Sequence, residues 1–209
     1  MASSLGAEFR RVEDREYEGK PAIVVVATRR YDTDVEDLWD AIVTPARLRR
    51  WFLPIEGELR VGGRYQLQGN AGGTIKRCDA PEALDLTWEF GGGISWVTVR
   101  LAADGPRTRL TLEHIAHRDG PGEEHMKRFG PGAVGVGWDL ALNGLGKWLR
   151  APEGALDPRA EEAWCSTDEG KAAIRASGEA WAEAFIASGA DGETAREQAR
   201  NTISFYTGG

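Results

Sequence analysis

Residues 83–116, ALDLTWEFGGGISWVTVRLAADGPRTRLTLEHIA, decide the fold of this 209-residue chain. Three runs within the segment alternate between apolar and polar side chains, and glycine-rich turns separate them. Alternation with a period of two is typical of strands that bury one face. The segment therefore predicts an antiparallel meander with strands at 83–90, 95–102 and 107–116.

The alternation also predicts which face of the sheet is apolar. The residues expected in the inner row are Leu84, Leu86, Trp88, Phe90, Val97, Val99, Leu101, Leu110, Leu112 and His114, with Tyr65 and Leu67 on an earlier strand. A sheet with one apolar face needs a second layer to cover it.

Upstream of the meander, further strands are expected at 22–28, 58–61, 64–68 and 74–78, each bounded by turn residues. Thr33 to Glu36 matches the capping-box pattern, which predicts a helix over 35–42. Thr44-Pro45 can then start a second short helix that carries Leu48, Trp51 and Phe52. No strand–helix–strand alternation occurs, which argues against a Rossmann-type sheet.

The covering layer is predicted to be a helix over 137–149. Trp138, Leu142, Leu145 and Leu149 recur there at helical spacing, and residues 130–135 form a glycine-rich lead-in. Asp139 and Asn143 fall on another side of this helix and are expected in solvent. Gly144 and Gly146 permit either close backbone approach or room for a ligand. Residues 1–19 are expected to form an N-terminal tail, 20–150 the main domain, and 151–209 a helical C-terminal extension.

Composition excludes several classes of function. The net charge of −7 disfavours a nucleic-acid partner and a membrane-surface role. The basic residues Arg47, Arg49 and Arg50 are expected on a solvated helix face. No secretory signal or membrane-spanning run is visible, so Cys78 and Cys165 are expected to be reduced thiols in a cytoplasmic protein.

Candidate chemistry is sparse. Glu113, His114, His117 and His125 lack metal-ligand spacing, and an odd separation places His114 and His117 on opposite faces of a strand, so no metal site is predicted. His114 lies in the inner row, where it can be a satisfied core histidine, a ligand contact or a general base. No catalytic motif is visible, and no cofactor is expected. The eight tryptophans fit either a Trp-rich core or the lining of a cavity.

Several motifs together resemble one family. They are the run from Tyr31 to Ile42, the step from Thr44-Pro45 to Trp51, the Gly62-Gly63-Arg64-Tyr65 turn, Leu86-Thr87-Trp88, the strand from Thr108 to His114, and Gly137-Trp138. They are similar to the SRPBCC (START/polyketide cyclase-like) superfamily, in the branch of the activator of heat-shock-protein-90 ATPase, over about residues 20–150. The resemblance implies an α+β helix-grip fold, in which a curved seven-stranded antiparallel sheet wraps around a long C-terminal helix and encloses a cavity.

The sequence and the resemblance together favour a binding module over an enzyme. The expected ligand is a hydrophobic or aromatic small molecule, lipid-like or polyketide-like. A cyclase- or hydrolase-like enzyme using the same cavity is the alternative, as is a co-chaperone or protein-interaction module whose C-terminal helices could support a homodimer. The residues expected to line the cavity are Tyr65, Trp88, Phe90, Val99, Leu112, His114, Trp138 and Leu142.

Overall fold

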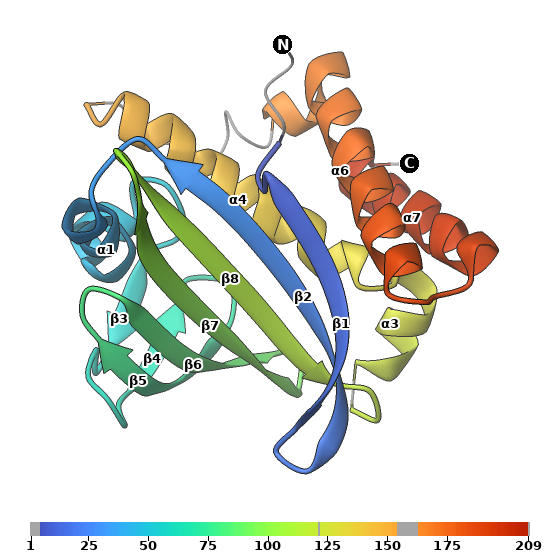
Figure 1. Ribbon diagram of the computed structural model, residues 1–209, viewed down its shortest axis with the longest axis horizontal. Helices are drawn as coiled ribbons and strands as arrows, with labels where there is room; N and C mark the ends of the chain where they lie inside the picture. The colour runs from blue at the N-terminus through green and yellow to red at the C-terminus, as the bar shows by residue number, and fades with distance from the viewer. Residues whose placement is uncertain (1–4, 121, 154–162, 209) are drawn as a thin grey trace.

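The computed structural model describes residues 5–120, 122–153 and 163–208, and its centre is one antiparallel sheet (Figure 1). The strands are β1 (Phe9–Tyr17), β2 (Lys20–Tyr31), β3 (Ile55–Gly57), β4 (Arg64–Leu67), β5 (Gly72–Asp79), β6 (Ala83–Phe90), β7 (Gly93–Asp104) and β8 (Arg107–His117). The principal helices are α1 (Val35–Val43), α2 (Pro45–Leu48), α3 (Glu123–Phe129), α4 (Gly132–Arg150), α6 (Asp168–Ala187) and α7 (Gly192–Thr207).

The sheet curves around α4, as the helix-grip prediction requires. Its eight strands run in the order β1-β2-β8-β7-β6-β5-β4-β3. Helix α4 packs on the inner face, behind the sheet in Figure 1, while α6 lies beside β1 and α7 packs against α6. The α+β fold and the covering helix are confirmed, while the expected number of seven strands is wrong by one.

Strands β6, β7 and β8 form the predicted meander. Leu86 pairs with Val97, and Val97 pairs in turn with His114. Residues that are paired across strands share one face of a sheet, so the inner row runs unbroken across the three strands. The two innermost strands bury this row almost completely, with Val99 at 7% and Leu112 at 4% exposure. Alternation therefore predicted both the strands and the buried face.

Strand β1 lies where the sequence predicts a tail. It pairs with β2 along its whole length, from Phe9 opposite Thr28 to Tyr17 opposite Lys20. The expected tail over 1–19 is therefore wrong for Phe9–Tyr17. The strand has little apolar signal, since Val12 is its one buried residue. An edge strand of this kind is ordered by its backbone hydrogen bonds to β2 more than by an apolar row.

The expected strand over 58–61 is also wrong. The strand before β4 is β3, which ends at Gly57, and the chain then turns so that the N–H of Glu58 donates to the carbonyl of Arg64 at 2.8 Å. Gly57 has a φ of +116°, in the region that favours glycine. Leu59 and Val61 gave the segment its alternating pattern, but they are 41% and 54% exposed because the turn projects them into solvent.

Helix α4 begins at Gly132, five residues before the predicted start, and its glycines let neighbouring groups approach the backbone. A Cβ on Gly135 would lie 2.3 Å from the ring of Trp181 in α6. A Cβ on Gly146 would lie 3.1 Å from the Arg29 guanidinium of β2. The predicted lead-in over 130–135 is thus helical from Gly132 onward. Of the two interpretations of Gly146, the structure supports close approach.

The C-terminal helices belong to the same packed core as the sheet. Ile174 and Trp181 of α6 are completely buried. In α7, the Tyr206 hydroxyl donates to the carbonyl of Ala133 at 2.8 Å. Thr202 donates in the same way to the carbonyl of Phe129 in α3, also at 2.8 Å. The predicted helical extension is confirmed, and it packs on the first half of α4.

Asp139 and Asn143, which were expected in solvent, are 0% and 8% exposed. Helical periodicity correctly separated them from the face with Leu142, but α6 and the N-terminal segment cover their side as well. The Asp139 carboxylate accepts hydrogen bonds from four groups, namely the Ala7 N–H at 2.8 Å, Arg10 Nε at 2.9 Å, Ser177 Oγ at 2.5 Å and Trp181 Nε1 at 3.0 Å. Burial raises the pKa of Asp139, although the charge of Arg10 and these hydrogen bonds act in the opposite direction.

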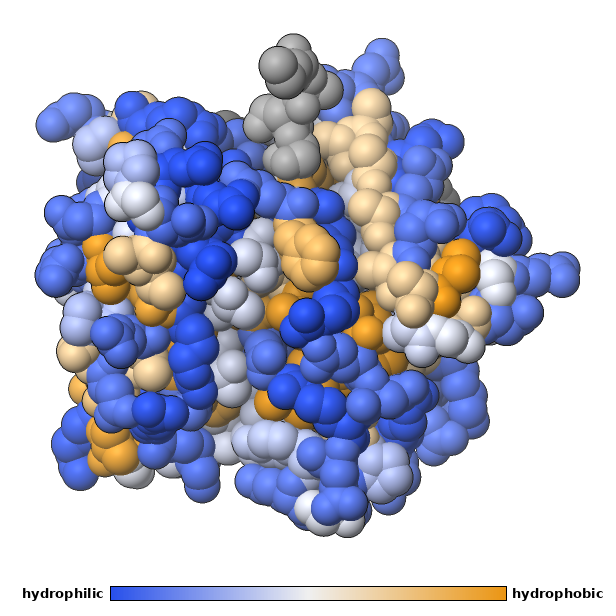
Figure 2. All heavy atoms as spheres, in the orientation of Figure 1, coloured by the Kyte–Doolittle hydropathy of each residue, from blue (hydrophilic) through white to orange (hydrophobic). Residues whose placement is uncertain are grey.

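A smaller apolar cluster lies on the outer face of the sheet, which Figure 2 shows as largely hydrophilic with hydrophobic atoms between the polar ones. The cluster consists of Ala22, Val24, Val26, Trp96 and Ile115. The rings of Tyr17 and His117 pack on Trp96, with ring centroids 4.8 and 4.7 Å away. An Arg15–Glu113 ion pair of 2.7 Å spans β1 and β8 on this face. Strand β1 thus contributes part of this outer cluster.

Candidate functional site

Five aromatic side chains meet where the turn after α2, strands β6 and β8, and helix α4 come together. We call Trp51, Phe52, Trp88, His114 and Trp138 the aromatic cluster. Ring centroids are 5.5 Å apart for Trp51–Phe52, 6.3 Å for Phe52–Trp138, 5.2 Å for Trp88–Trp138, and 6.1 and 6.0 Å from His114 to Trp88 and Trp138. These separations are typical of favourable aromatic contacts.

The cluster is partly exposed. Trp51, Phe52, Trp88 and Trp138 are all partly accessible to solvent, whereas His114 is 8% exposed. Four other tryptophans, Trp39, Trp96, Trp148 and Trp181, are buried. The interpretation of the Trp-rich composition as a packed core therefore holds for four of the eight residues, and three of the remainder form one partly accessible aromatic surface.

A chain of hydrogen bonds fixes His114 in one tautomer. Trp138 Nε1 lies 3.0 Å from His114 Nδ1, and because an indole N–H can only donate, Nδ1 is the acceptor. The ring proton is therefore on Nε2, which donates to Ser95 Oγ at 2.8 Å. The Ser95 hydroxyl donates in turn to the carbonyl of Trp88 at 3.1 Å. Burial lowers the pKa of His114 to about 4, so the ring is neutral near pH 7.

The hydrogen bond between His114 and Ser95 has the wrong direction for nucleophilic catalysis. A serine nucleophile is activated when the histidine Nε2 accepts its proton. Here Nε2 donates to Ser95, so His114 is not placed to accept a proton from Ser95 and does not act as its general base. The arrangement instead ties the Trp138 ring to the backbone of Trp88 through two polar side chains. His114 thus acts as the polar anchor of the aromatic cluster.

Trp51 and Phe52 are site residues that sequence reasoning missed. It placed them on the short helix that Thr44-Pro45 starts, but helix α2 ends at Leu48 and the turn that follows points both rings toward α4. The Trp51 indole N–H donates to the carbonyl of Ala41 in α1 at 2.9 Å. Two adjacent aromatic residues in a helix-ending turn were the available signal, because such rings are rarely left in solvent without a contact.

The predicted lining residues divide into groups. Trp88, His114 and Trp138 meet in the aromatic cluster. Val99, Leu112 and Leu142 lie in the main core between the sheet and α4, and each is buried.

Tyr65 lies in a small core that packs against the aromatic cluster, and Phe90 lies away from it. Tyr65 packs with Leu48 and Leu67, its hydroxyl donates to the carbonyl of Thr87 at 2.7 Å, and burial raises its pKa. Phe90 is 61% exposed, so its expected place in a cavity lining is wrong. It is the last residue of β6, opposite Gly93 at the hairpin. Alternation predicts the face of a strand on which a side chain lies, but not how far along the strand the covering layer extends.

The remaining candidates for chemistry lie apart from the cluster. His117 faces the outer side, with Nε2 2.9 Å from the carbonyl of Tyr17, so His114 and His117 are on opposite faces as alternation predicts. Across residues 5–120, 122–153 and 163–208, His, Cys, Asp and Glu side chains form no group of three that could hold a metal ion. In the same part of the chain, no helix has the length and apolar character to cross a bilayer.

A small space of about 10 Å³ lies between α6, α7 and the start of α4. Trp181, Phe185 and Gln198 are among its lining residues. Such a volume holds about one water molecule at most. It is therefore too small for the ligand class that the sequence predicts.

Comparison with known proteins supports the same fold. Residues 32–150, more than half of the chain, match the family model "Activator of Hsp90 ATPase homolog 1-like protein". The crystal structure of CalU16 from Micromonospora echinospora is 32% identical with a TM-score of 0.63, covering 85% of this chain and 98% of that one. Its solution structure is 34% identical with a TM-score of 0.69, covering 90% and 100%.

A more distant structure, DynU16 from the dynemicin biosynthetic locus, is 19% identical with a TM-score of 0.52 and covers 62% of this chain and 48% of that one, which shows the fold alone. No curated protein matches the sequence. The family-model match and the similarity to CalU16 over nearly its full length agree with the helix-grip geometry. The chain belongs to the Activator of Hsp90 ATPase homolog 1-like family.

Proposed function

We propose that this protein binds a hydrophobic or aromatic small molecule at the aromatic cluster, between the sheet and α4. The observation that carries the proposal is the contiguous, partly exposed surface of Trp51, Phe52, Trp88 and Trp138. Large apolar rings that remain accessible in one contiguous place commonly mark a binding surface. Aromatic faces favour a flat apolar ligand that can stack on them.

The polar groups around the cluster favour a neutral ligand. His114 is neutral and has both ring nitrogens in hydrogen bonds. The hydroxyl of Tyr65 is likewise occupied by a backbone carbonyl. Burying a charge beside such groups without a partner is strongly unfavourable. A ligand that reaches further in, between sheet and helix, would contact Val99, Leu112 and Leu142.

Titration with N-phenyl-1-naphthylamine, a neutral apolar fluorophore, tests the proposal. We expect saturable binding with energy transfer from tryptophan. Trp88→Leu and Trp138→Leu should each weaken binding by about tenfold, because a lost aromatic contact and its buried area together exceed about 1.4 kcal/mol.

Trp164→Leu is the matched control. Trp164 is also partly exposed, but it contacts Lys147 at the far end of α4, with the Lys147 ammonium 4.6 Å from its ring centroid. This variant should bind the fluorophore like the wild type. The proposal is wrong if the wild type shows no saturable binding, or if the Trp88 and Trp138 variants bind as well as the Trp164 variant.

A further inference from the structure

We infer that Arg47 is a positioning residue of this site, which holds Trp51 and Phe52 at their distance from α4. The inference rests on the proposed function and adds a residue that does not contact the ligand itself. Arg47 was expected on a solvated helix face. Its side chain is instead 26% exposed and lies between α1 and α4.

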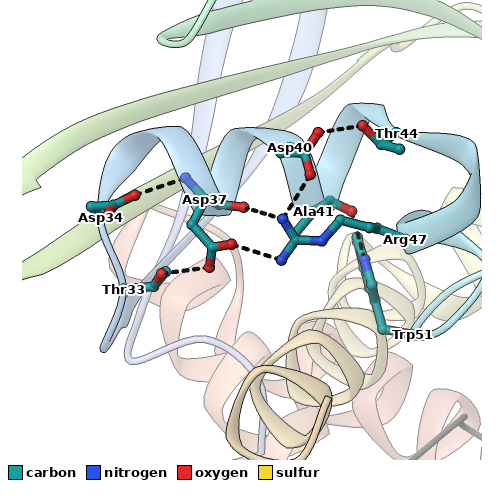
Figure 3. A network of polar contacts seen from close by, with 8 residues as sticks. All are labelled: Thr33, Asp34, Asp37, Asp40, Ala41, Thr44, Arg47 and Trp51. Carbon is teal, nitrogen blue, oxygen red and sulfur yellow. Dashed lines mark hydrogen bonds and ion pairs between the residues drawn. The ribbon is translucent and has the colours of Figure 1, made fainter. Parts of the chain in front are cut away.

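One edge of the Arg47 guanidinium is bound by α1 (Figure 3). Nη2 donates to Asp37 Oδ1 at 2.8 Å, and Nη1 donates to Asp40 Oδ2 at 2.8 Å. Thr33 donates to the other oxygen of Asp37 at 2.6 Å, and Thr44 donates to Asp40. The hydrogen bond from Thr33, followed by Arg47, lowers the pKa of Asp37, and Arg47 lowers that of Asp40, so both carboxylates are charged at neutral pH.

The face of the same guanidinium covers α4. Its central carbon lies 4.9 Å from the ring centroid of Trp148, which is 6% exposed. A planar guanidinium can bind carboxylates along its edge and stack on an indole with its face. The compact ammonium of lysine cannot do both in this geometry. Arg47 therefore joins α1 and α2 to the C-terminal part of α4.

Helix α2 and the turn that follows it form one short segment, which also contacts α4 near Trp138 through the aromatic cluster. Trp51 is bonded back to Ala41 of α1 at 2.9 Å, as Figure 3 shows, and Phe52 stacks on Trp138 at 6.3 Å. Trp138 and Trp148 are ten residues apart, or about 15 Å along the helix. The segment is thus attached to α4 at two separated points. If the contact at Trp148 is lost, the remaining contact at Trp138 leaves the segment free to pivot and change the spacing of the rings.

Arg47→Lys is the test variant. It keeps the positive charge but removes the planar guanidinium, which stacks on Trp148 and binds Asp37 and Asp40 along one edge. Its effect on thermal stability should be small, since partly exposed ion pairs contribute little. Its dissociation constant for N-phenyl-1-naphthylamine should rise about tenfold. Arg30→Lys is the matched control: Arg30 also binds two carboxylates, Glu8 at 3.2 Å and Asp104 at 2.6 Å, but away from the cluster. It should leave binding unchanged.

A mutant cycle with the paired substitution Trp51→Leu and Phe52→Leu separates positioning from a general structural effect. If Arg47 acts through these two rings, adding Arg47→Lys to the protein that lacks both should weaken binding by less than about twofold. The inference is overturned if the wild type binds and Arg47→Lys binds equally well, or if Arg47→Lys and the loss of the two rings weaken binding by independent factors. A wild type that does not bind the fluorophore refutes the proposed function, and this inference with it.

Discussion

Replacing Asp139 by Asn is expected to destabilise the fold by about 3 kcal/mol. Asp139 is completely buried, and Arg10, its ion-pair partner at 2.8 Å, is 12% exposed. The four donors to the Asp139 carboxylate come from three parts of the chain: the segment before β1, which carries Ala7, strand β1, which carries Arg10, and helix α6, which carries Ser177 and Trp181. All of them meet on α4, so loss of the carboxylate charge weakens three interfaces at once.

The expected loss of stability follows from which of the four donors can still form a hydrogen bond with the introduced amide. Removing one partner of a buried ion pair typically destabilises a protein by about 3–5 kcal/mol. The oxygen of the introduced amide can keep the hydrogen bond from Ala7, and the hydroxyl of Ser177 can reverse and accept from the amide nitrogen. Trp181 can only donate, so it loses its acceptor. Arg10 retains the Leu5 carbonyl at 2.7 Å and lies 5.8 Å from the ring centroid of Trp181, which places the loss near the lower limit.

Urea denaturation followed by tryptophan fluorescence measures this loss directly, provided that the m-value is unchanged. Arg10→Met combined with Asp139→Asn should recover much of the loss, because removing both charges of a buried pair leaves none uncompensated. A single Asp139→Asn variant within about 1 kcal/mol of the wild type would refute the reasoning, since that value is no larger than one neutral hydrogen bond.

Other predictions concern His114 and the glycines of α4. As pH falls from 6.5 to 4, the unfolded chain protonates His114 before the folded one, whose pKa burial lowers to about 4. The wild type should thus lose about 3 kcal/mol more stability than His114→Gln over this range in denaturation curves; equal losses would contradict it. ¹⁵N NMR at pH 7 should show the proton of His114 on Nε2, and a proton on Nδ1 would exclude the hydrogen bond from Trp138. Gly135→Ala should destabilise by about 1–3 kcal/mol, because the new Cβ would lie 2.3 Å from the Trp181 ring. Gly132→Ala, with its nearest contact at 3.4 Å, should be neutral, and similar losses for both variants would rule out this packing effect.

The alternation of apolar and polar residues was sufficient to predict a strand wherever one face of that strand is buried by one covering layer. Strand β6 has the predicted bounds, and β7 and β8 differ from theirs by at most two residues at either end. Residues of the inner row such as Val99 and His114 are buried as alternation predicts, because a strand with one covered face must place alternate side chains under the cover. The same prediction is wrong for Phe90. Its side chain lies on the predicted face of the strand, but at the hairpin end, beyond the covering layer.

The partly exposed surface of the site depends on contacts between segments that are distant in sequence. Phe52 stacks on Trp138, and Trp51 is hydrogen-bonded to Ala41, because the turn after α2 packs against both α4 and α1. No spacing within the chain encodes that contact, since it depends on how α1 and α2 pack against α4.

The sequence by itself determined the antiparallel meander, the covering helix and the inner position of His114, because each is a periodic or nearest-neighbour property of a short segment. The tertiary structure decided that a charged N-terminal segment is strand β1, that Asp139 is buried, and that three tryptophans share one partly exposed surface. Those features depend on which second element covers a given side chain. Hydrogen-bond partners and burial are properties of pairs of elements, and pairing is fixed only when the whole chain has folded.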